Sequence, residues 1–68
     1  MIDLKSVGIN CKKFRESRGY YQSRVADDTG YSIENVSAFE HGSNDNYRLL
    51  LWYIMHGMNI SDLLGGDD

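Results

Sequence analysis

Groups that could support catalysis or bind a metal are few and scattered along the chain. Histidine occurs only at positions 41 and 56, and neither has cysteines or carboxylates at ligand spacing beside it. A zinc site needs three or four such ligands together. The sequence also lacks a recognisable Ser/His/Asp spacing and a phosphate-cradling glycine loop. We therefore expect no enzyme, no catalytic residue, no metal and no cofactor, and we interpret the single cysteine, Cys11, as a small buried apolar group.

The residues best suited to specific recognition lie between positions 32 and 38. An asparagine on an exposed helix can pair with adenine, a glutamate can accept from the amino group of cytosine, and a small apolar side chain can touch a thymine methyl. Asn35, Glu34 and either Ile33 or Ala38 have these chemistries, although Glu34 would also repel phosphate. Such contacts require a helix that stands clear of the rest of the molecule, so the surrounding elements must be identified.

Two short helical patterns meet at Gly30. The first runs from about Gln22 to Thr29, and the second follows Ser32 and ends at the His-Gly pair of positions 41 and 42. The residues that line one face of each are Val25, Ala26 and Thr29 in the first, and Val36 and Phe39 in the second. Gly30 suits the left-handed backbone of a tight turn. Two helices joined by a glycine-containing turn form a helix-turn-helix, whose second helix usually lies in the DNA major groove.

Three further helices complete the predicted fold. A helix from about Ser6 to Arg18 has Val7, Cys11 and Phe14 at helical spacing. A helix from about Asn46 to His56 contains an unbroken apolar run from Leu49 to Met55, and must be covered on more than one side. A short helix over residues 59–64 is capped by Ser61 or Asn59. No alternating strand pattern is present, so we expect an all-α domain over residues 1–66 with a frayed tail at 67–68.

Composition indicates a single, small, dipolar domain. The chain has 68 residues and a net charge of −3, divided as +4 over residues 1–26 and −7 over residues 27–68. A domain of this size buries only about 60% of the surface of its unfolded chain, so a partner subunit would help to stabilise it. The single cysteine, the absence of a leader-like start and the lack of an apolar run of about 20 residues predict a cytoplasmic protein without a membrane span.

The chain resembles the lambda-repressor-like, Cro-type helix-turn-helix domains of the XRE family over residues 7–66. The matching segments, in order, are Val7-Gly8 through Arg18-Gly19, Tyr20-Tyr21-Gln22, Val25-Ala26, Gly30-Tyr31-Ser32, Val36-Ser37, Phe39-Glu40-His41-Gly42 and Gly57 through Gly66. Each motif alone is weak, but their order and spacing together are specific. The resemblance implies a five-helix fold with an ion pair between Arg15 and Glu40.

The resemblance also implies a function, which is sequence-specific DNA binding by a transcriptional regulator of the repressor or Cro type, from a prophage or mobile element. We expect a homodimer that binds a near-palindromic operator with its third helix in the major groove. The expected DNA-binding residues are Tyr21, Gln22, Arg24, Ser32, Ile33, Glu34, Asn35, Ser37, Ala38, His41 and Asn44. The expected dimer interface, on the fifth helix and the outer side of the fourth, consists of Trp52, Ile60, Leu63 and Leu64.

Departures from the family pattern leave a second interpretation open. Tyr21 replaces the family's Ser or Thr at the start of the second helix, and residues 32–38 contain no Arg, Lys or Gln. The second half of the chain is acidic. These features also suit a protein-interaction module on the same fold, which would bind a repressor or a host factor in place of DNA. A third interpretation is that the chain is the N-terminal part of a longer regulator.

Overall fold

Residues 3–64 form five helices, and the first of them packs against three of the others. The computed structural model describes residues 3–64, and every regular element in that range is α-helical. The helices are α1 (Leu4–Ser17), α2 (Gln22–Thr29), α3 (Ile33–Glu40), α4 (Tyr47–Met55) and α5 (Ile60–Leu64). Helix α1 packs against α3, α4 and α5, while α2 packs against α3 and α4. The expected all-α class is confirmed, and the tail expected at residues 67 and 68 lies outside the described residues.

Short polar side chains determine where the middle helices begin. The hydroxyl of Ser32 accepts a hydrogen bond from the backbone N–H of Asn35 at 3.1 Å, as expected for the cap of α3. The Asn46 Oδ1 accepts from the N–H of Arg48 at 3.0 Å and so caps α4. Each such cap stabilises its helix by about 1 kcal/mol. The observed starts of α3 and α4 therefore follow from residues immediately before them in the sequence.

The two terminal helices differ in detail from the expectation. Helix α1 begins at Leu4 instead of Ser6, because the Asp3 carboxylate accepts from the N–H of Ser6 at 2.7 Å and caps the helix earlier. Helix α5 is capped by Asn59, whose Oδ1 accepts from the N–H of Asp62 at 2.9 Å, and Asp62 returns a bond to the N–H of Asn59. This reciprocal arrangement satisfies two N–H groups at once. Of the two caps considered for this helix, Asn59 is the one used.

The apolar stripes of the helices converge on one core. It consists of Val7, Cys11, Phe14, Val25, Ala26, Val36, Phe39, Leu49, Trp52, Tyr53 and Met58. The interpretation of Cys11 as a buried apolar group is confirmed, since its side chain is fully buried and its Sγ lies 3.9 Å from the Sδ of Met58. Burial raises the pKa of the Cys11 thiol to about 12, so it stays protonated at neutral pH.

Helix α1 crosses the C-terminal end of α3 at very short range. A Cβ atom at Gly8 would lie 2.5 Å from the carbonyl oxygen of Phe39 and 2.6 Å from that of Glu40. These are backbone atoms that cannot rotate away, so only glycine fits this position without a shift of one helix. Gly8 therefore determines how closely α3 is held to α1.

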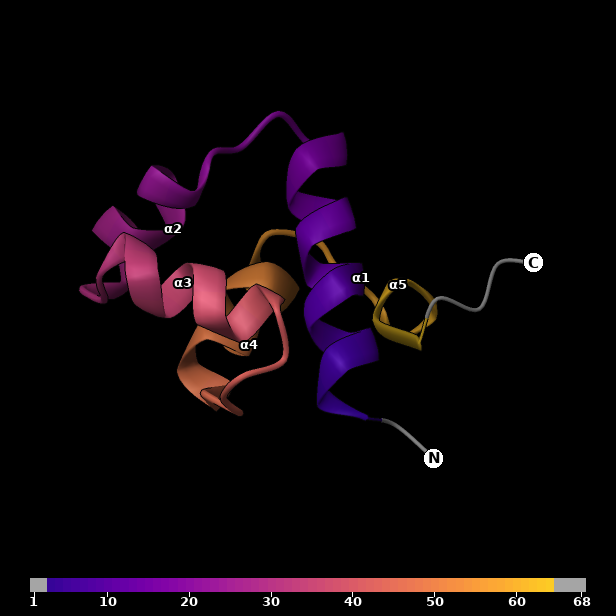
Figure 1. Cartoon of the computed structure of the whole chain (residues 1–68). Helices are drawn as coiled ribbons and strands as arrows, with labels where there is room; N and C mark the ends of the chain where they lie inside the picture. Colours follow the sequence, from indigo (N-terminus) through magenta and orange to yellow (C-terminus); the bar gives the residue numbers. More distant parts are fainter. Residues whose placement is uncertain (1–2, 65–68) are drawn as a thin grey trace.

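Helix α4 buries only one side of its apolar run. Leu49, Trp52 and Tyr53 point into the core, whereas Leu51 and Met55 are exposed. Helix α5 packs on α1, and Figure 1 shows it on the opposite side of α1 from α2 and α3. Neither α4 nor any other helix within residues 3–64 combines the length and the apolar character needed to cross a membrane.

Candidate functional site

The segment from α2 to α3 has the geometry that the glycine predicts. Helix α2 ends at Gly30, whose φ of 80° lies in the left-handed region, and Ser32 then caps α3. A side chain at position 30 would meet no atom, so backbone conformation alone accounts for the glycine. Figure 1 shows α2 and α3 together at one end of the molecule, away from α5. These two helices thus form a continuous unit connected by a short turn.

Helix α3 has one buried face and one exposed face. Val36, Phe39 and Glu40 are buried, and they hold the helix against the rest of the domain. The expected DNA-binding residues on the exposed first turn are Ser32, Ile33, Glu34 and Asn35. Ser37 and Ala38, also expected to contact DNA, are half-buried and present less surface. The structure therefore brings the recognition candidates together on the first turn of α3, which is not covered by any other described element.

A buried ion pair fixes α3 to α1. The Nε and Nη2 atoms of Arg15 donate to the two carboxylate oxygens of Glu40 at 2.8 and 3.0 Å. The side chain of Arg15 is 7% exposed and that of Glu40 is 0% exposed. This is the bidentate pair that the family resemblance implies, and its two parallel bonds restrict the orientation of both groups. The pair lies at the C-terminal end of α3, so it anchors the helix while leaving its first turn free.

Two further donors, which the sequence pattern did not indicate, complete the environment of Glu40. The Tyr53 hydroxyl donates to its Oε2 at 2.5 Å, and the Gln22 amide donates to its Oε1 at 3.1 Å. Burial acts to raise the pKa of Glu40, but the hydrogen bonds from Arg15, Tyr53 and Gln22 outweigh it and hold the pKa below its ordinary value. One carboxylate therefore connects α3 to α1, α2 and α4.

Gln22, one of the expected DNA-binding residues, thus has a structural partner as well. An ionised carboxylate only accepts hydrogen bonds, so the NH₂ group of Gln22 must face Glu40. That group has two N–H bonds, and one of them is left for another acceptor. The preceding residue, Tyr21, is 77% exposed and makes no side-chain cap, so the start of α2 is open.

The other expected contact residues have local roles of their own. Arg24 donates to the Asp28 carboxylate at 2.8 Å on the surface of α2. The His41 ring Nδ1 lies 2.7 Å from the carbonyl oxygen of Ser37, and His41 occupies the C-cap of α3. The Oδ1 of Asn44 accepts from the N–H of Asn46 at 3.1 Å, which leaves its amide NH₂ without a partner within residues 3–64. Arg24 is thus partly neutralised, whereas His41 and Asn44 keep polar atoms at the surface.

Comparison with protein-family models, with curated proteins and with solved structures finds no match to this chain. What the chain does must therefore be inferred from the geometry of its described residues.

The residues expected at the dimer interface differ in how far they are exposed. Trp52 is 5% exposed, and its indole N–H donates to Asp28 at 2.9 Å, so it belongs to the packing of α4 on α2. Leu63 is half-buried and packs against the core, while Ile60 is exposed. The side chain of Leu64 lies outside the described residues. The apolar residues that α4 does expose were not in the expected set, because an unbroken apolar run does not indicate which side faces the core.

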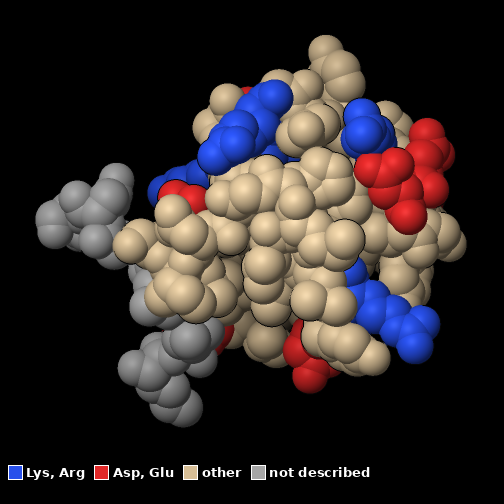
Figure 2. All heavy atoms as spheres, turned by 180° about the vertical axis from the view of Figure 1, so that it is seen from behind, with Lys and Arg blue, Asp and Glu red and all other residues tan. Residues whose placement is uncertain are grey.

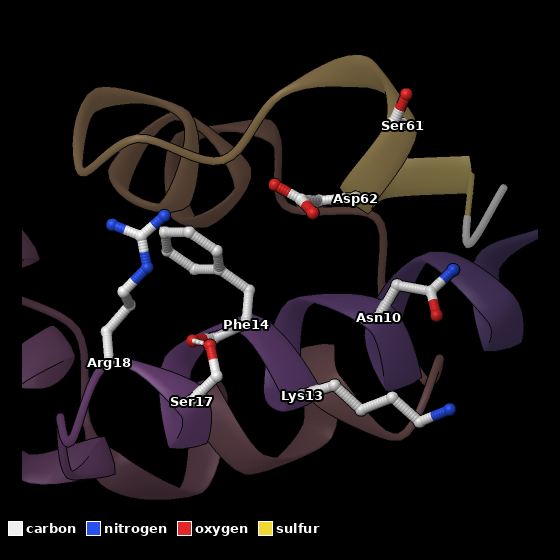
Figure 3. A pocket seen from close by; sticks show the side chains of 7 residues that line it. All are labelled: Asn10, Lys13, Phe14, Ser17, Arg18, Ser61 and Asp62. Atoms are coloured by element: carbon white, nitrogen blue, oxygen red, sulfur yellow. Dashed lines mark hydrogen bonds between the residues drawn. The ribbon is translucent and has the colours of Figure 1, made fainter. Parts of the chain in front are cut away.

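A hollow lies between α1 and α5, with a volume of about 320 Å³ (Figure 3). The guanidinium of Arg18 lies 4.7 Å from the centre of the Phe14 ring, and Asp62 extends toward it from α5. The Asp62 carboxylate is already bonded to its own helix cap, and Asn10 donates to the carbonyl of Leu63 at 2.9 Å. The bond from Asn10 attaches α5 to α1. No group of three His, Cys, Asp or Glu side chains within residues 3–64 is placed to hold a metal ion.

Proposed function

We propose that this chain is a sequence-specific DNA-binding transcriptional regulator with a lambda-repressor-like helix-turn-helix, in which α2 and α3 are the two motif helices. The observation that carries the proposal is the exposed first turn of α3, held from behind by buried Val36, Phe39 and Glu40. A helix anchored at its far end and exposed at its start can enter the major groove without unfolding its packing. A homodimer would place two such helices on a near-palindromic operator.

Side chains on that turn match the base edges available in the groove. Asn35 can form a bidentate pair with adenine, Glu34 can accept from the amino group of cytosine, and Ile33 can touch a thymine methyl. Each good bidentate pair contributes about 1–3 kcal/mol of discrimination against the wrong base. Sequence preference in this proposal therefore comes from three adjacent residues at the start of one helix.

The start of α2 supplies a site for the DNA backbone. Its first N–H groups have no side-chain cap, and the free N–H of Gln22 lies at the same end of the helix. Helix starts attract phosphate because their N–H groups and dipole favour an anion. Contacts of this kind set the register of the protein on the duplex and carry no sequence information. Six of the chain's seven cations also lie in residues 1–26, in and around α1 and α2.

Selection of bound sequences from a random DNA pool tests the proposal most directly. We expect enrichment of a near-palindromic site, bound by the full chain with an affinity measurable by fluorescence anisotropy. Asn35→Ala should lower affinity for the selected site by about tenfold to a hundredfold, because one base pair loses its partner. Ser61→Ala, an exposed substitution on α5, serves as the matched control and should leave binding unchanged. A pool that yields no enriched sequence even at low salt would exclude DNA as the ligand.

A specific observation favours a second candidate, a protein-interaction module. The exposed first turn of α3 contains Glu34 and no cation, and Arg24 on α2 is paired with Asp28. An exposed first turn of α3 that is acidic suits a basic or apolar protein partner better than a phosphate backbone. Glu34→Gln distinguishes the two candidates, since it should strengthen binding to non-specific DNA in the first and weaken partner binding in the second.

A further inference from the structure

Helix α4 presents an apolar stripe to solvent. Tyr47, Leu51, Ile54 and Met55 stand at helical spacing along its outer side, and the exposed fraction is 46% for Leu51, 43% for Ile54 and 81% for Met55. Figure 2, which views the molecule from behind, shows a broad surface without charged side chains that is bordered by basic and acidic groups. Exposed apolar residues that stand singly are ordinary, but a contiguous stripe marks an interaction surface.

A groove between α2 and α4 adjoins this stripe. Its volume is about 440 Å³, and its lining includes Asp28, Arg48, Leu51, Trp52, Met55 and His56. The rings of Trp52 and His56 stack with their centres 3.9 Å apart beside the groove, and Trp52 is only 5% exposed there. The groove therefore combines an apolar wall with one acidic and one basic side chain.

The two charged residues of the groove each keep unused bonding capacity. Arg48 is the only cation in residues 27–68. The two ion pairs found within residues 3–64, Arg15–Glu40 and Arg24–Asp28, do not include it. Asp28 accepts from Arg24 and from Trp52, but both bonds end on Oδ2. The Oδ1 atom of Asp28 has no hydrogen-bond partner within residues 3–64, so it can accept from a guanidinium outside the molecule.

We infer that a second copy of this chain docks on this face, with the α4 helices in contact across a two-fold axis. A two-fold contact pairs the same surface patch of both copies. Each contact between two different residues therefore occurs twice. Met55 inserts into the groove of the partner subunit, and Arg48 pairs with Asp28 of the partner subunit. A surface with an apolar stripe, a groove, a cation outside the ion pairs of residues 3–64 and a carboxylate with one oxygen left to accept is complementary to itself. The inference specifies the surface of the homodimer that the proposed function invokes, but the contact itself needs no DNA.

The size of the face predicts a weak dimer. A stable interface buries about 800 Å² on each partner, which is roughly a sixth of the 4500 Å² accessible surface of this chain. The stripe and the groove are only part of one side of the molecule. We therefore expect a dissociation constant in the micromolar range, and a dimer that forms and dissociates quickly.

Sedimentation velocity of the full chain without DNA tests the contact at concentrations from about 1 µM to 1 mM. The wild type should shift from monomer to dimer across this range. Met55→Glu should raise the dissociation constant tenfold or more, because it places a carboxylate in the apolar groove. Ile60→Glu is the matched control, since Ile60 is an apolar residue of similar exposure on α5 and lies outside the face. Far-UV circular dichroism verifies that both variants remain folded.

A charge exchange tests the Arg48–Asp28 pairing. Arg48→Asp and Asp28→Lys should each weaken self-association, since each sets like charges against one another across the axis. An equimolar mixture of the two variants should associate again, because the mixed dimer restores an attractive pair on both sides. Asp28→Lys loses its bonds to Arg24 and Trp52 and could be destabilised for that reason. In that case the comparison of Met55→Glu with Ile60→Glu still tests whether this face is the dimer contact.

Three results would overturn the inference. These are a wild type that stays monomeric up to 1 mM, a Met55→Glu variant that associates like the wild type, and an Ile60→Glu variant that is impaired as much as Met55→Glu. Failure of DNA binding is measured separately. A chain that dimerises through this face but ignores DNA would remove the proposed function and leave the inference standing.

Discussion

At the scale of single residues, Glu40 has the largest structural role. Its buried carboxylate receives donors from Arg15, Gln22 and Tyr53, which belong to three other helices. We expect Glu40→Ala to destabilise the domain by about 3–5 kcal/mol, because it leaves the Arg15 charge buried without a partner. Urea unfolding followed by circular dichroism measures this loss. Arg24→Ala removes the exposed pair with Asp28 and should cost far less stability, because solvent screens an exposed pair, so equal losses in the two variants would contradict the role assigned to Glu40.

The same carboxylate predicts a pH dependence of stability. The pKa of Glu40 is lowered from its ordinary value of 4.5 in the folded state, so the folded chain binds this proton less readily than the unfolded chain. The stabilisation is therefore fully present above pH 4.5 and is lost as the pH falls through the lower folded-state pKa. The urea concentration at the unfolding midpoint of the wild type should decrease as the pH is lowered through this acidic range. Glu40→Gln, which does not titrate there, should lack that component of the fall.

Gln22 combines a structural contact with a proposed functional one. Gln22→Ala loses the hydrogen bond to Glu40, which should cost about 1 kcal/mol of stability, and also loses the N–H that we assign to a phosphate. We expect the variant to stay folded and to bind DNA several-fold more weakly, with unchanged base preference. Gln22→Glu places a second carboxylate beside Glu40 and should be less stable than Gln22→Ala. A Gln22→Ala variant with full DNA affinity at a temperature where it is folded would remove Gln22 from the proposed site.

At the scale of the elements, the approach of α1 to α3 depends on the absence of a side chain at position 8. Alanine is favoured over glycine in a helix interior by about 1 kcal/mol. We nevertheless expect Gly8→Ala to destabilise the domain by about 1–3 kcal/mol, because its Cβ would overlap the backbone carbonyls of Phe39 and Glu40. Thermal unfolding shows whether the Gly8→Ala variant melts below or above the wild type. A stabilised Gly8→Ala variant would mean that α1 and α3 separate more easily than this contact implies.

Element boundaries were predictable wherever a local signal defined them. Gly30 and Ser32 determine the end of α2 and the start of α3 through left-handed backbone and a side-chain cap, and both helices have the expected bounds. The start of α1 was missed by two residues, because Asp3 is an equally good cap that lies before the apolar stripe begins. Such signals act over three or four residues, so the sequence contains them directly.

At the scale of the whole molecule, the uneven distribution of charge governs the proposed encounter with DNA. The chain carries +4 over residues 1–26 and −7 over residues 27–68, so in the proposed complex the phosphates would be attracted mainly to the basic segment, which includes the start of α2. We expect the affinity for a selected site to fall at least tenfold between about 50 and 200 mM salt, which corresponds to about two phosphate contacts at the start of α2. Titration at several salt concentrations gives the slope. Affinity independent of salt would show that phosphate contacts contribute little.

The sequence by itself determined the helices, the glycine turn and the side chains offered at the start of α3, because caps, glycines and apolar spacing act between near neighbours. Only the tertiary structure decided that Tyr53 and Gln22 share the carboxylate of Glu40, and that Trp52 lies in the core while Met55 faces solvent. A run of seven apolar residues makes every side of α4 equally suited to burial. The side that becomes buried depends on where α1 and α2 lie, and that is a property of the assembled helices.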